Sequence, residues 1–342
     1  MNKSTKAQAN ITAASPLVSV IIANYNYGCF LAEAIESVLI QTYHNFELIV
    51  VDDGSTDNSR DIIEFYGDRL ITILQDNAGQ GGAFNAGIAR AKGEIICFLD
   101  SDDYFHREKL AKVVLSFQNH PEWVQISHYW ISVNREGLPI HRSSTHTLNQ
   151  GDVRNFLLKR GKYEWARTSG LAYRREALQK VLPMTTQRFE PVYAYLTTTV
   201  PFYGKVGRIN ESLMFYRIHD KNMSARTADL SYLIQLHESI ANYVNETAAK
   251  TGLKERFDIQ QDADYRIFKV LQAGRVSWTE VLQVIWLTLH ETIYMRCSIK
   301  ESLARLLWGT MCILSPSECR TVLRFGLHSY LHFKVLGTEL ES

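Results

Sequence analysis

The sequence lacks several features that mark specialised classes of protein. It has five cysteines in 342 residues, an odd number, and no two of them form a C-x-x-C pair. This pattern argues against a disulfide framework or a zinc ribbon, and it fits the reducing cytosol. No apolar stretch reaches the ~18 uninterrupted residues that a membrane-spanning helix needs. We therefore expect a cytoplasmic protein that does not cross a membrane.

The chain also lacks an excess of charge of either sign. Its 37 Lys and Arg residues offset 36 Asp and Glu residues, which leaves a formal net charge of +1. Such a balance creates no global field to attract a polyanion, so a nucleic-acid binder is not expected. Hydrophobic residues make up 46% of the chain, including 17 Tyr and 15 Phe, which is enough for a sizeable core. Residues 1–15 are mostly polar, without the apolar segment of a signal peptide, and we expect a disordered tail there.

From residue 17 onward, short apolar runs alternate with segments of helical periodicity. The runs are rich in β-branched residues, as is typical of strands buried on both faces. This alternation predicts an α/β fold with a mostly parallel sheet flanked by helices. We expect strands at residues 17–22, 46–51, 70–74 and 94–99, helices at residues 30–39, 59–66 and 83–91, and a glycine-rich loop at residues 77–82.

After about residue 121 the pattern loosens, and from residue 228 the chain reads as helices. Two of these helices carry apolar faces, one with Trp278, Leu282, Ile285 and Leu289 and the other with Ile299, Leu303, Leu306 and Leu307. Before them we expect a strand at residues 123–133, a hairpin turn at Glu136 and Gly137, a short strand and helix within residues 167–178, and several short strands within residues 203–224.

Each of the four N-terminal strands is followed by a polar cluster. Right-handed crossovers place the loops that follow parallel strands on one edge of the sheet. Open α/β sheets bind their ligands at that edge. The sequence therefore predicts a ligand site where four clusters meet, at residues 24–26, 52–57, 76–82 and 100–103.

The most acidic of these clusters is Asp100, Ser101, Asp102 and Asp103. Crowded carboxylates repel one another, and a bound cation relieves that repulsion. Oxygen ligands on an exposed loop favour Mg²⁺ or Mn²⁺ over zinc, with substrate phosphates and water completing the shell. The alternative is a solvated acidic turn that caps the helix beginning near Arg107. We give it less weight because the cluster follows a buried strand, opposite a second Asp-rich strand end.

The other two acidic or glycine-rich loops give weaker signals. In the segment VVDDGSTDNS, turn and cap preferences explain part of the composition, but Asp53 at the strand end can also accept a hydrogen bond from a nucleobase. The segment NAGQGGAFNAG would let a phosphate approach backbone N–H groups at a helix start. It is neither a Walker loop nor G-x-G-x-x-G, because Phe84 stands at the last glycine position. A tight turn before a helix is an equally weighted alternative.

Together, four segments resemble family 2 glycosyltransferases with the GT-A fold. They read VSVIIANYN, QTYHNFELIVVDDGSTD, NAGQGGAFNAGIARAKGEIICFLDSDD and LMFYRIHDKNMS, and the resemblance covers about residues 16–225. It implies an inverting, metal-dependent transfer from a nucleotide-sugar, with a UDP-sugar favoured, to a glycan or lipid-linked acceptor hydroxyl in cell-surface polysaccharide or glycoconjugate synthesis. It also implies a GT-A domain at residues 16–227, with a nucleotide-sugar-binding half (16–120) and an acceptor half (121–227), before a helical region at residues 228–342.

The resemblance assigns roles to individual residues. Asp53 would pair with the base, Asp100 would contact the ribose or metal region, and Asp102 would bind the metal that bridges two phosphates. His219 would face the diphosphate and metal, with a structural histidine as the alternative, and Arg217 would reach a phosphate, with a surface ion pair as the alternative. The implied donor site comprises Ala23, Asn24, Tyr25, Asp53, Gly81, Asn85, Asp100, Ser101 and Arg217, and the implied metal site comprises Asp102 and His219.

The chain departs from the family at the general base, which takes the acceptor proton. Alignment places Tyr193 at the position where many relatives have an Asp, and a tyrosine pKa of about 10 suits that task poorly. The nearest carboxylate is Glu190, three residues earlier, which we assign as the base. If neither residue serves, the protein would bind a nucleotide-sugar without efficient transfer. A receiver-like signalling module is a third hypothesis, because two Asp residues end a parallel strand, but the chain is too long for that alone.

Two further sets of residues remain open in their roles. Trp130, Trp165, Arg167, Thr168 and Ser169 fall where acceptors dock in relatives, although both Trp residues could equally fill the core. In the tail, amphipathic helices with Trp and basic residues can lie on an anionic membrane surface, here the inner face of the cell membrane. A helical bundle that packs on the catalytic domain or on a second subunit, as a homo-oligomer, is the favoured alternative. The tail residues concerned are Trp278, Trp286, Trp308, Arg296, Lys300, Arg305, Arg320 and Arg324.

Overall fold

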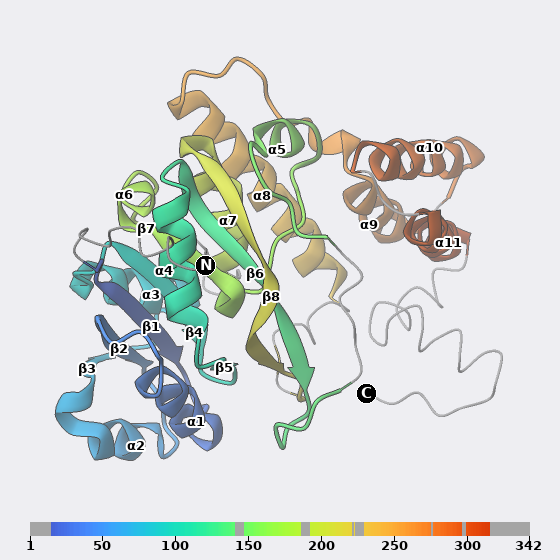
Figure 1. Cartoon of the computed structure of the whole chain (residues 1–342). Coiled ribbons are helices and arrows are strands. Elements are labelled where there is room, and N and C mark those ends of the chain that lie inside the picture. Colours follow the sequence, from blue (N-terminus) through green and yellow to red (C-terminus); the bar gives the residue numbers. More distant parts are fainter. Residues whose placement is uncertain are drawn as a thin grey trace, which may run out of the picture.

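The computed structural model describes residues 15–140, 147–185, 192–220, 222, 229–274, 276–295 and 299–314. Its centre is one eight-stranded sheet, in the order β3-β2-β1-β4-β7-β6-β8-β5, with helices on both faces and a group of helices beyond one edge (Figure 1). The fold is therefore α/β with a largely parallel sheet and C-terminal helices, as the sequence predicts. The expected tail at residues 1–15 lies almost wholly outside the described residues.

The N-terminal half of the sheet consists of four parallel strands. They are β1 (Val18–Asn24), β2 (Phe46–Asp53), β3 (Ile71–Gln75) and β4 (Ile95–Asp100). Their registers pair Asn24 with Asp52 and Ala23 with Asp100, so the carboxyl ends of the three central strands lie level. The helices that connect or follow them are α1 (Gly28–Leu39), α2 (Ser59–Tyr66), α3 (Gly79–Arg90) and α4 (Lys109–Asn119).

Two apolar layers sandwich the sheet because successive side chains of a strand point to opposite faces. Val20 and Ile22 of β1 belong to the layer that includes Leu31 of α1. Between them, Ile21 belongs to the other layer, with Phe84 of α3. All five side chains are fully buried. The strands are apolar at successive positions because helices cover both faces of the sheet.

The start of α3 corrects the expected glycine loop. The helix begins at Gly79 and ends at Arg90, so most of the glycine-rich segment is its first turn. Its first turn is held by Asp53, whose carboxylate accepts hydrogen bonds from the backbone N–H of Ala78 and Gly79, both at 2.8 Å. Glycine also has a packing reason at Gly87, where a Cβ would lie 2.4 Å from a methyl carbon of Ile21.

The second half of the sheet is mixed rather than parallel. β7 (Leu171–Arg174) runs antiparallel to both β4 and β6 (Trp123–Val133), and β5 (Tyr104–Phe105) runs antiparallel to β8 (Lys205–Arg217). The several short strands expected within residues 203–224 are in fact the single strand β8, which pairs with β6 through three shifts of register. The remaining helices of this half are α5 (Arg154–Arg160), α6 (Arg175–Leu178) and α7 (Val192–Thr199).

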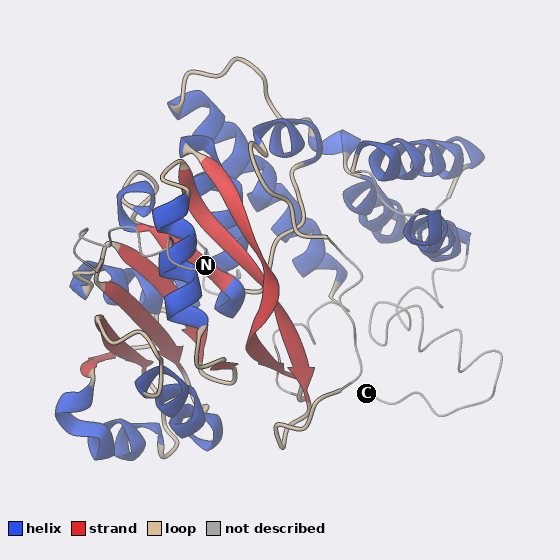
Figure 2. Cartoon of the chain, in the orientation of Figure 1, coloured by secondary structure: helices blue, strands red, loops and turns tan. Residues whose placement is uncertain are grey.

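The C-terminal region is helical in its described part (Figure 2). Its helices are α8 (Leu230–Lys250), α9 (Ala263–Ala273), α10 (Trp278–Tyr294) and α11 (Ile299–Leu314). α8 shares a core with the sheet domain, because Val244 packs in one cluster with Leu157 of α5. α9, α10 and α11 form a separate cluster against the start of α8. The division of the chain at residue 228 and the two halves of the sheet domain stay predictions.

Candidate active site

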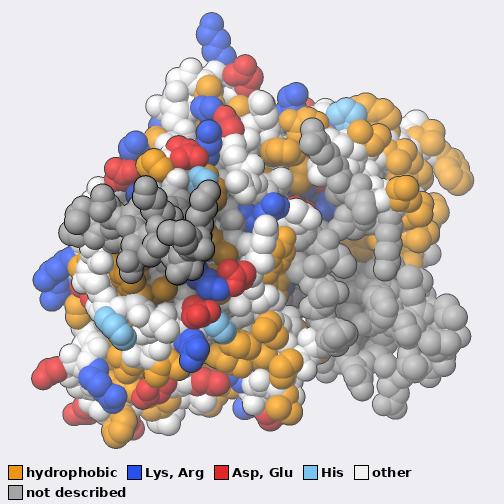
Figure 3. Space-filling model, viewed as in Figure 1, with side chains coloured by type: hydrophobic (Ala, Val, Ile, Leu, Met, Phe, Trp, Pro, Cys, Tyr) orange, Lys and Arg blue, Asp and Glu red, His pale blue; other side chains and the backbone are white. Residues whose placement is uncertain are grey.

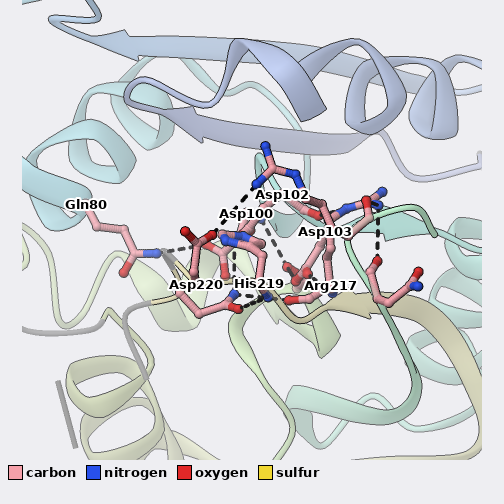
Figure 4. Close-up of polar contacts among 11 residues, drawn as sticks. Gln80, Asp100, Asp102, Asp103, Arg217, His219 and Asp220 are labelled. Atoms are coloured by element: carbon pink, nitrogen blue, oxygen red, sulfur yellow. Dashed lines mark hydrogen bonds and ion pairs between the residues drawn. The ribbon is translucent and has the colours of Figure 1, made fainter. Parts of the chain in front are cut away.

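The acidic segment forms a tight turn at the carboxyl end of β4. The N–H of Asp103 donates to the backbone oxygen of Asp100 at 3.0 Å, which closes the turn. Asp100 Oδ1 accepts a hydrogen bond from Gln80 Nε2 at 2.8 Å (Figure 4). The oxygen of the same amide, Gln80 Oε1, accepts the N–H of Val192 at 3.1 Å. Gln80, which the sequence analysis did not single out, thus joins the acidic turn to the start of α7.

Ser169 stabilises this turn through hydrogen bonds to two of its residues. Its Oγ donates to Asp103 Oδ2 at 2.6 Å and accepts the N–H of Asp100 at 3.1 Å. Its backbone oxygen accepts from Nζ of Lys109, a fully buried lysine whose pKa burial lowers to about 7. Ser169 is itself fully buried, and Thr168 is only 5% exposed. Their burial disfavours the expectation that these two residues meet an acceptor, which stays a prediction.

The carboxylates of the turn are electrostatically strained. Burial, and then repulsion from Asp102, raises the pKa of Asp100 to about 7. Burial, and then repulsion from Asp102 and Asp100, raises the pKa of Asp103 well above its usual value. A positive charge placed among these groups would lower the free energy of their ionised forms. The turn therefore has the chemistry of a cation or cation–phosphate site.

Asp102 and His219 lie side by side at this turn, with side chains that are 15% and 2% exposed. His219 Nε2 lies 3.0 Å from Asp102 Oδ2, and the imidazole stacks on the Phe30 ring with centroids 5.1 Å apart. Among the described residues, no three His, Cys, Asp or Glu side chains gather as a complete metal cage. A carboxylate and an imidazole side by side fit a divalent cation that takes its other ligands from substrate and water. The two residues that the resemblance assigns to a metal thus lie together, although their sequence positions differ by 117.

Arg217 is held within the protein rather than displayed to a ligand. Its side chain is 2% exposed, and its guanidinium lies 4.8 Å from the centre of the Phe30 ring. Nε donates to the backbone oxygen of Asp102 at 2.9 Å, Nη1 donates to that of Arg135, and Nη2 pairs with Glu33. All three nitrogens therefore have protein acceptors. This geometry favours the ion-pair alternative over direct phosphate contact and makes Arg217 a residue that positions the acidic turn.

The end of β1 presents an acceptor atom for which the described part of the chain supplies no partner. Asn24 is 1% exposed, and its Nδ2 donates to Asp52 Oδ1 and to Ser55 Oγ, both at 3.1 Å. Its Oδ1 has no hydrogen-bond partner among the residues that the structure describes. Tyr25, the next residue, is 45% exposed, and Ala23 is half-buried beside Asp100 in the register. A buried, unpaired oxygen beside an exposed ring is what a bound ligand would be expected to complete.

Two residues of the expected donor site, Asp53 and Asn85, form hydrogen bonds to backbone groups of the protein. Besides the two N–H groups at the start of α3, Asp53 accepts from Gln75 Nε2 at 2.7 Å, which uses three of about four acceptor positions on a carboxylate. Asn85 exchanges two hydrogen bonds of 2.9 Å with the backbone of Met184. A role for Asn85 in donor contact is thus disfavoured, whereas Asp53 keeps capacity for one more donor. Gly81 is buried in the first turn of α3, and Ser101 is buried within the acidic turn.

The expected acceptor side is lined by aromatic rings. The exposed guanidinium of Arg167 lies 4.4 Å from the centre of the Tyr216 ring and 5.9 Å from that of Trp130. Trp165 lies 6.4 Å from Tyr193, centroid to centroid, and both are partly exposed. Stacking on a planar cation or a sugar ring is open to such side chains.

Of the two candidates for the general base, the structure describes Tyr193 alone. Glu190 lies outside the described residues, so its assignment stays a prediction. Tyr193 is described on α7, and burial raises its pKa above the usual value. A raised pKa leaves even less of the tyrosine at neutral pH as the phenolate that could accept a proton. The structure therefore makes Tyr193 a poor candidate for proton abstraction.

Comparison with known proteins decides the family. The profile of the family described as "Glycosyl transferase family 2" matches residues 19–182. An uncharacterized glycosyltransferase of Nostoc sp. is 37% identical over 320 residues, which is 89% of this chain and 98% of that protein. The chain belongs to glycosyltransferase family 2. It is therefore a transferase, and the receiver-like hypothesis is wrong.

Other relatives share only part of the chain or only the fold. The Escherichia coli protein named UDP-Glc:alpha-D-GlcNAc-diphosphoundecaprenol beta-1,3-glucosyltransferase WfaP is 40% identical over 117 residues, or 34% of this chain and 47% of that one. The crystal structure of S. aureus TarS 1-349 in complex with UDP-GlcNAc superimposes with a TM-score of 0.54 at 16% identity, covering 95% of this chain and 93% of that one. This second likeness extends the shared fold beyond the matched family segment.

Proposed function

We propose that this glycosyltransferase moves a sugar from a nucleoside diphosphate sugar to an acceptor hydroxyl, with inversion and with help from a divalent cation. The observation that carries the proposal is the Asp102–His219 pair, 3.0 Å apart. It belongs to a turn whose carboxylates burial and mutual repulsion destabilise. Strand register places this turn level with the end of β1, where Asn24 Oδ1 has no hydrogen-bond partner in the part of the chain that the structure describes.

The nucleoside would bind at the ends of β1 and β2. Asn24 Oδ1 and the remaining acceptor position of Asp53 suit N–H donors of a nucleobase, and Tyr25 offers an exposed ring for stacking. Asp100, held by Gln80, would accept a hydroxyl of the ribose. A UDP-sugar is the favoured donor, because a solved protein of similar fold carries UDP-GlcNAc and a partial relative is named for UDP-Glc.

Asp102 and His219 would hold the cation, Mg²⁺ or Mn²⁺. When bound, such an ion neutralises negative charge on the departing nucleoside diphosphate. Asp103, Ser169 and Arg217 would keep the turn in place without touching the donor, because each is buried and hydrogen-bonded within the protein.

The acceptor proton would pass to Glu190. A carboxylate at that position would accept it from the attacking hydroxyl as the new glycosidic bond forms. The acceptor is proposed to be a glycan or a lipid-linked glycan in polysaccharide or glycoconjugate synthesis, since a partial relative is named for a diphosphoundecaprenol acceptor. The five scattered cysteines fit a cytoplasmic enzyme, and none of the three that the structure describes is part of a disulfide.

The test measures UDP binding by titration calorimetry with and without Mn²⁺. Asp102→Asn should weaken Mn²⁺-dependent UDP affinity by at least about tenfold, because it removes a charged ligand. Asp220→Asn is the matched control, because Asp220 is close in sequence to His219 but 75% exposed in its side chain. Affinity that Asp102→Asn leaves unchanged, or that chelation of Mn²⁺ does not alter, would refute the metal role.

Turnover is measured separately, as UDP release from a panel of UDP-sugars. Glu190→Gln should abolish transfer while leaving UDP binding intact. Binding without turnover, with no effect of Glu190→Gln, would favour the alternative of a family member that binds nucleotide-sugars without efficient transfer.

A further inference from the structure

Two amide side chains of α3 contact the chain before and after the sequence position of Glu190, the proposed base. Asn85 exchanges two hydrogen bonds of 2.9 Å with the backbone of Met184. Gln80 Oε1 accepts the N–H of Val192 at 3.1 Å. Glu190 lies between Met184 and Val192 in the sequence. One helix thus holds the chain on both sides of the residue that would take the acceptor proton.

The two amides differ in what else they contact. Within the described residues, both hydrogen bonds of the Asn85 side chain go to Met184. Gln80 also reaches the acidic turn, because its Nε2 donates to Asp100 Oδ1 at 2.8 Å (Figure 4). An amide has one donor end and one acceptor end, so a carboxylate on one side and an N–H on the other fix its orientation. Gln80 therefore bridges a carboxylate of the proposed donor site and the start of α7.

The hydrogen bond to Val192 stabilises the start of α7. Val192 is the first residue of that helix, and the first four N–H groups of an α-helix have no acceptor within the helix. Its side chain is fully buried in the apolar layer that also contains Phe84 of α3. A buried N–H without an acceptor is destabilising. The carbonyl oxygen of Gln80 therefore helps to hold the first turn of α7 in place.

The backbone of Gln80 is fixed by the same donor-site loop. Asp53 accepts the N–H groups of Ala78 and Gly79, both at 2.8 Å, which holds the first turn of α3 at the end of β2. A ligand that fixes the Asp100 carboxylate would then leave Gln80 held at its backbone and at both ends of its amide. These contacts form one continuous path from the acidic turn to α7.

We propose that Gln80 is a positioning residue that couples nucleotide binding at the acidic turn to the placement of the start of α7. The inference rests on the proposed function, because it takes a nucleotide and a cation as the ligands that fix Asp100. With Asp100 fixed, Gln80 keeps Val192 and the adjoining chain in place for the reaction with the acceptor. Asn85 holds the other side of that chain whether or not a nucleotide is bound.

The test is hydrogen exchange of the backbone amides of the full chain, with and without UDP and Mn²⁺. In the wild type, UDP with Mn²⁺ should slow exchange at the start of α7 at least about fivefold. Gln80→Met keeps the length of the side chain but removes both hydrogen bonds. It should abolish that slowing at UDP concentrations that calorimetry shows to be saturating. Gln80→Asn, which is one methylene shorter and cannot bridge both partners, is the second variant and should have the same effect.

Asn85→Leu is the matched control. It removes two hydrogen bonds from the same helix but leaves the bridge intact, so UDP should still slow exchange at the start of α7. Exchange in α10 is the internal reference, because α10 lies away from α3 and α7 (Figure 1). The outer side of α10 carries the apolar surface seen in Figure 3, although no helix among the described residues is long and apolar enough to cross a bilayer. The effect of UDP on α10 should be the same in the wild type and the variants.

Turnover separates positioning from a loss of folded protein. The rate of UDP release from the UDP-sugar that the wild type uses is expressed per UDP-binding site, as counted by calorimetry. Gln80→Met should lower this kcat at least about tenfold, because a small misplacement of reacting groups can cost about a hundredfold. The KM for the UDP-sugar should change much less, since Asp100 keeps its other contacts with the donor.

Each outcome bears on one claim. The coupling is overturned if UDP binds to the wild type but leaves exchange in α7 unchanged, or if Gln80→Met retains the slowing. Loss of the slowing in Asn85→Leu as well would assign the effect to the general stability of α3, and this also overturns it. All three results leave the proposed function intact, because binding is measured in the same samples. A wild type that binds no UDP would overturn the proposed function, and the coupling with it.

Discussion

Two clusters of buried carboxylates in this molecule differ in what balances them. At the sheet edge, burial and then repulsion from Asp102 raises the pKa of Asp100 to about 7. At the junction with the C-terminal helices, Asp264 and Glu291 each lie 2.8 Å from Lys162 Nζ, and Asp262 lies 3.6 Å from it. Although burial alone would raise it, Lys162 holds the pKa of Asp262 and of Asp264 below the usual value.

The difference is the one expected between a cluster that only stabilises the fold and a candidate ligand site. The junction carries its own cations as side chains, Lys162 among the three carboxylates and Arg305 at 2.8 Å from Glu291 Oε1, so much of the negative charge is compensated whenever the protein is folded. Burial still raises the pKa of Glu291 above its usual value. The sheet edge has far less compensation of its own, and its neighbour Arg217 is turned to backbone oxygens and Glu33. Functional sites commonly keep such unfavourable charge until a ligand arrives.

The largest expected effect is at the junction. Lys162→Met leaves three carboxylates without the cation they share, and it should lower the free energy of unfolding by about 3–5 kcal/mol. Urea denaturation measures the change, with Lys92→Met as the control, because Lys92 is exposed. A loss below about 1 kcal/mol would remove the contrast between the clusters.

A smaller effect of opposite sign is expected at the sheet edge. Asp100→Asn removes a carboxylate that burial and Asp102 disfavour, while Oδ1 can still accept from Gln80. Without divalent cation, it should raise the free energy of unfolding at neutral pH by about 1 kcal/mol. Asp262→Asn is the paired variant and should destabilise. If both changes destabilise equally, the sheet edge is a structural cluster too.

The smallest expected effect on the free energy of unfolding comes from His237, and it depends on pH. Burial opposes the charged imidazolium, but Asp262, 2.7 Å from His237 Nδ1, raises the pKa of His237 above its usual value. The stabilisation is therefore complete below the unfolded pKa of about 6.5 and is lost as the pH rises through the folded pKa. His237→Gln should cost about 1 kcal/mol near pH 6 and less near pH 9 in urea unfolding. The exposed pair of His120 with Glu122 supplies the control, His120→Gln, which should change little at either pH.

The strands and their polar ends could be read from the sequence. Buried parallel strands are continuous apolar runs, so the first four strands lie within about two residues of their expected ends. Parallel strands also share one carboxyl edge, so the acidic turn and the end of β1 could be expected to meet. The resemblance then paired Asp102 with His219, and the structure brings the two together.

The sequence could not show how single side chains are used. Ser169 resembled an acceptor contact, but it is buried under the acidic turn, and Gln80 was hidden in a glycine-rich segment that proved to be helix. Arg217 meets Asp102 across 115 positions, and no local pattern reports such a contact. Rotamers and partners are decided by packing between distant segments.

The helical tail shows most clearly which features the sequence predicts and which only the tertiary structure decides. Apolar residues at helical spacing determined by themselves that one helix would run through residues 278–289 and another through residues 299–307, where α10 and α11 lie. Periodicity cannot say what an apolar side faces, because a core and a lipid surface reward the same side chains. Only the tertiary structure showed that Val281 and Val284 face the core while Trp278, Leu282 and Trp286 face outward, since that depends on where the neighbouring helices lie.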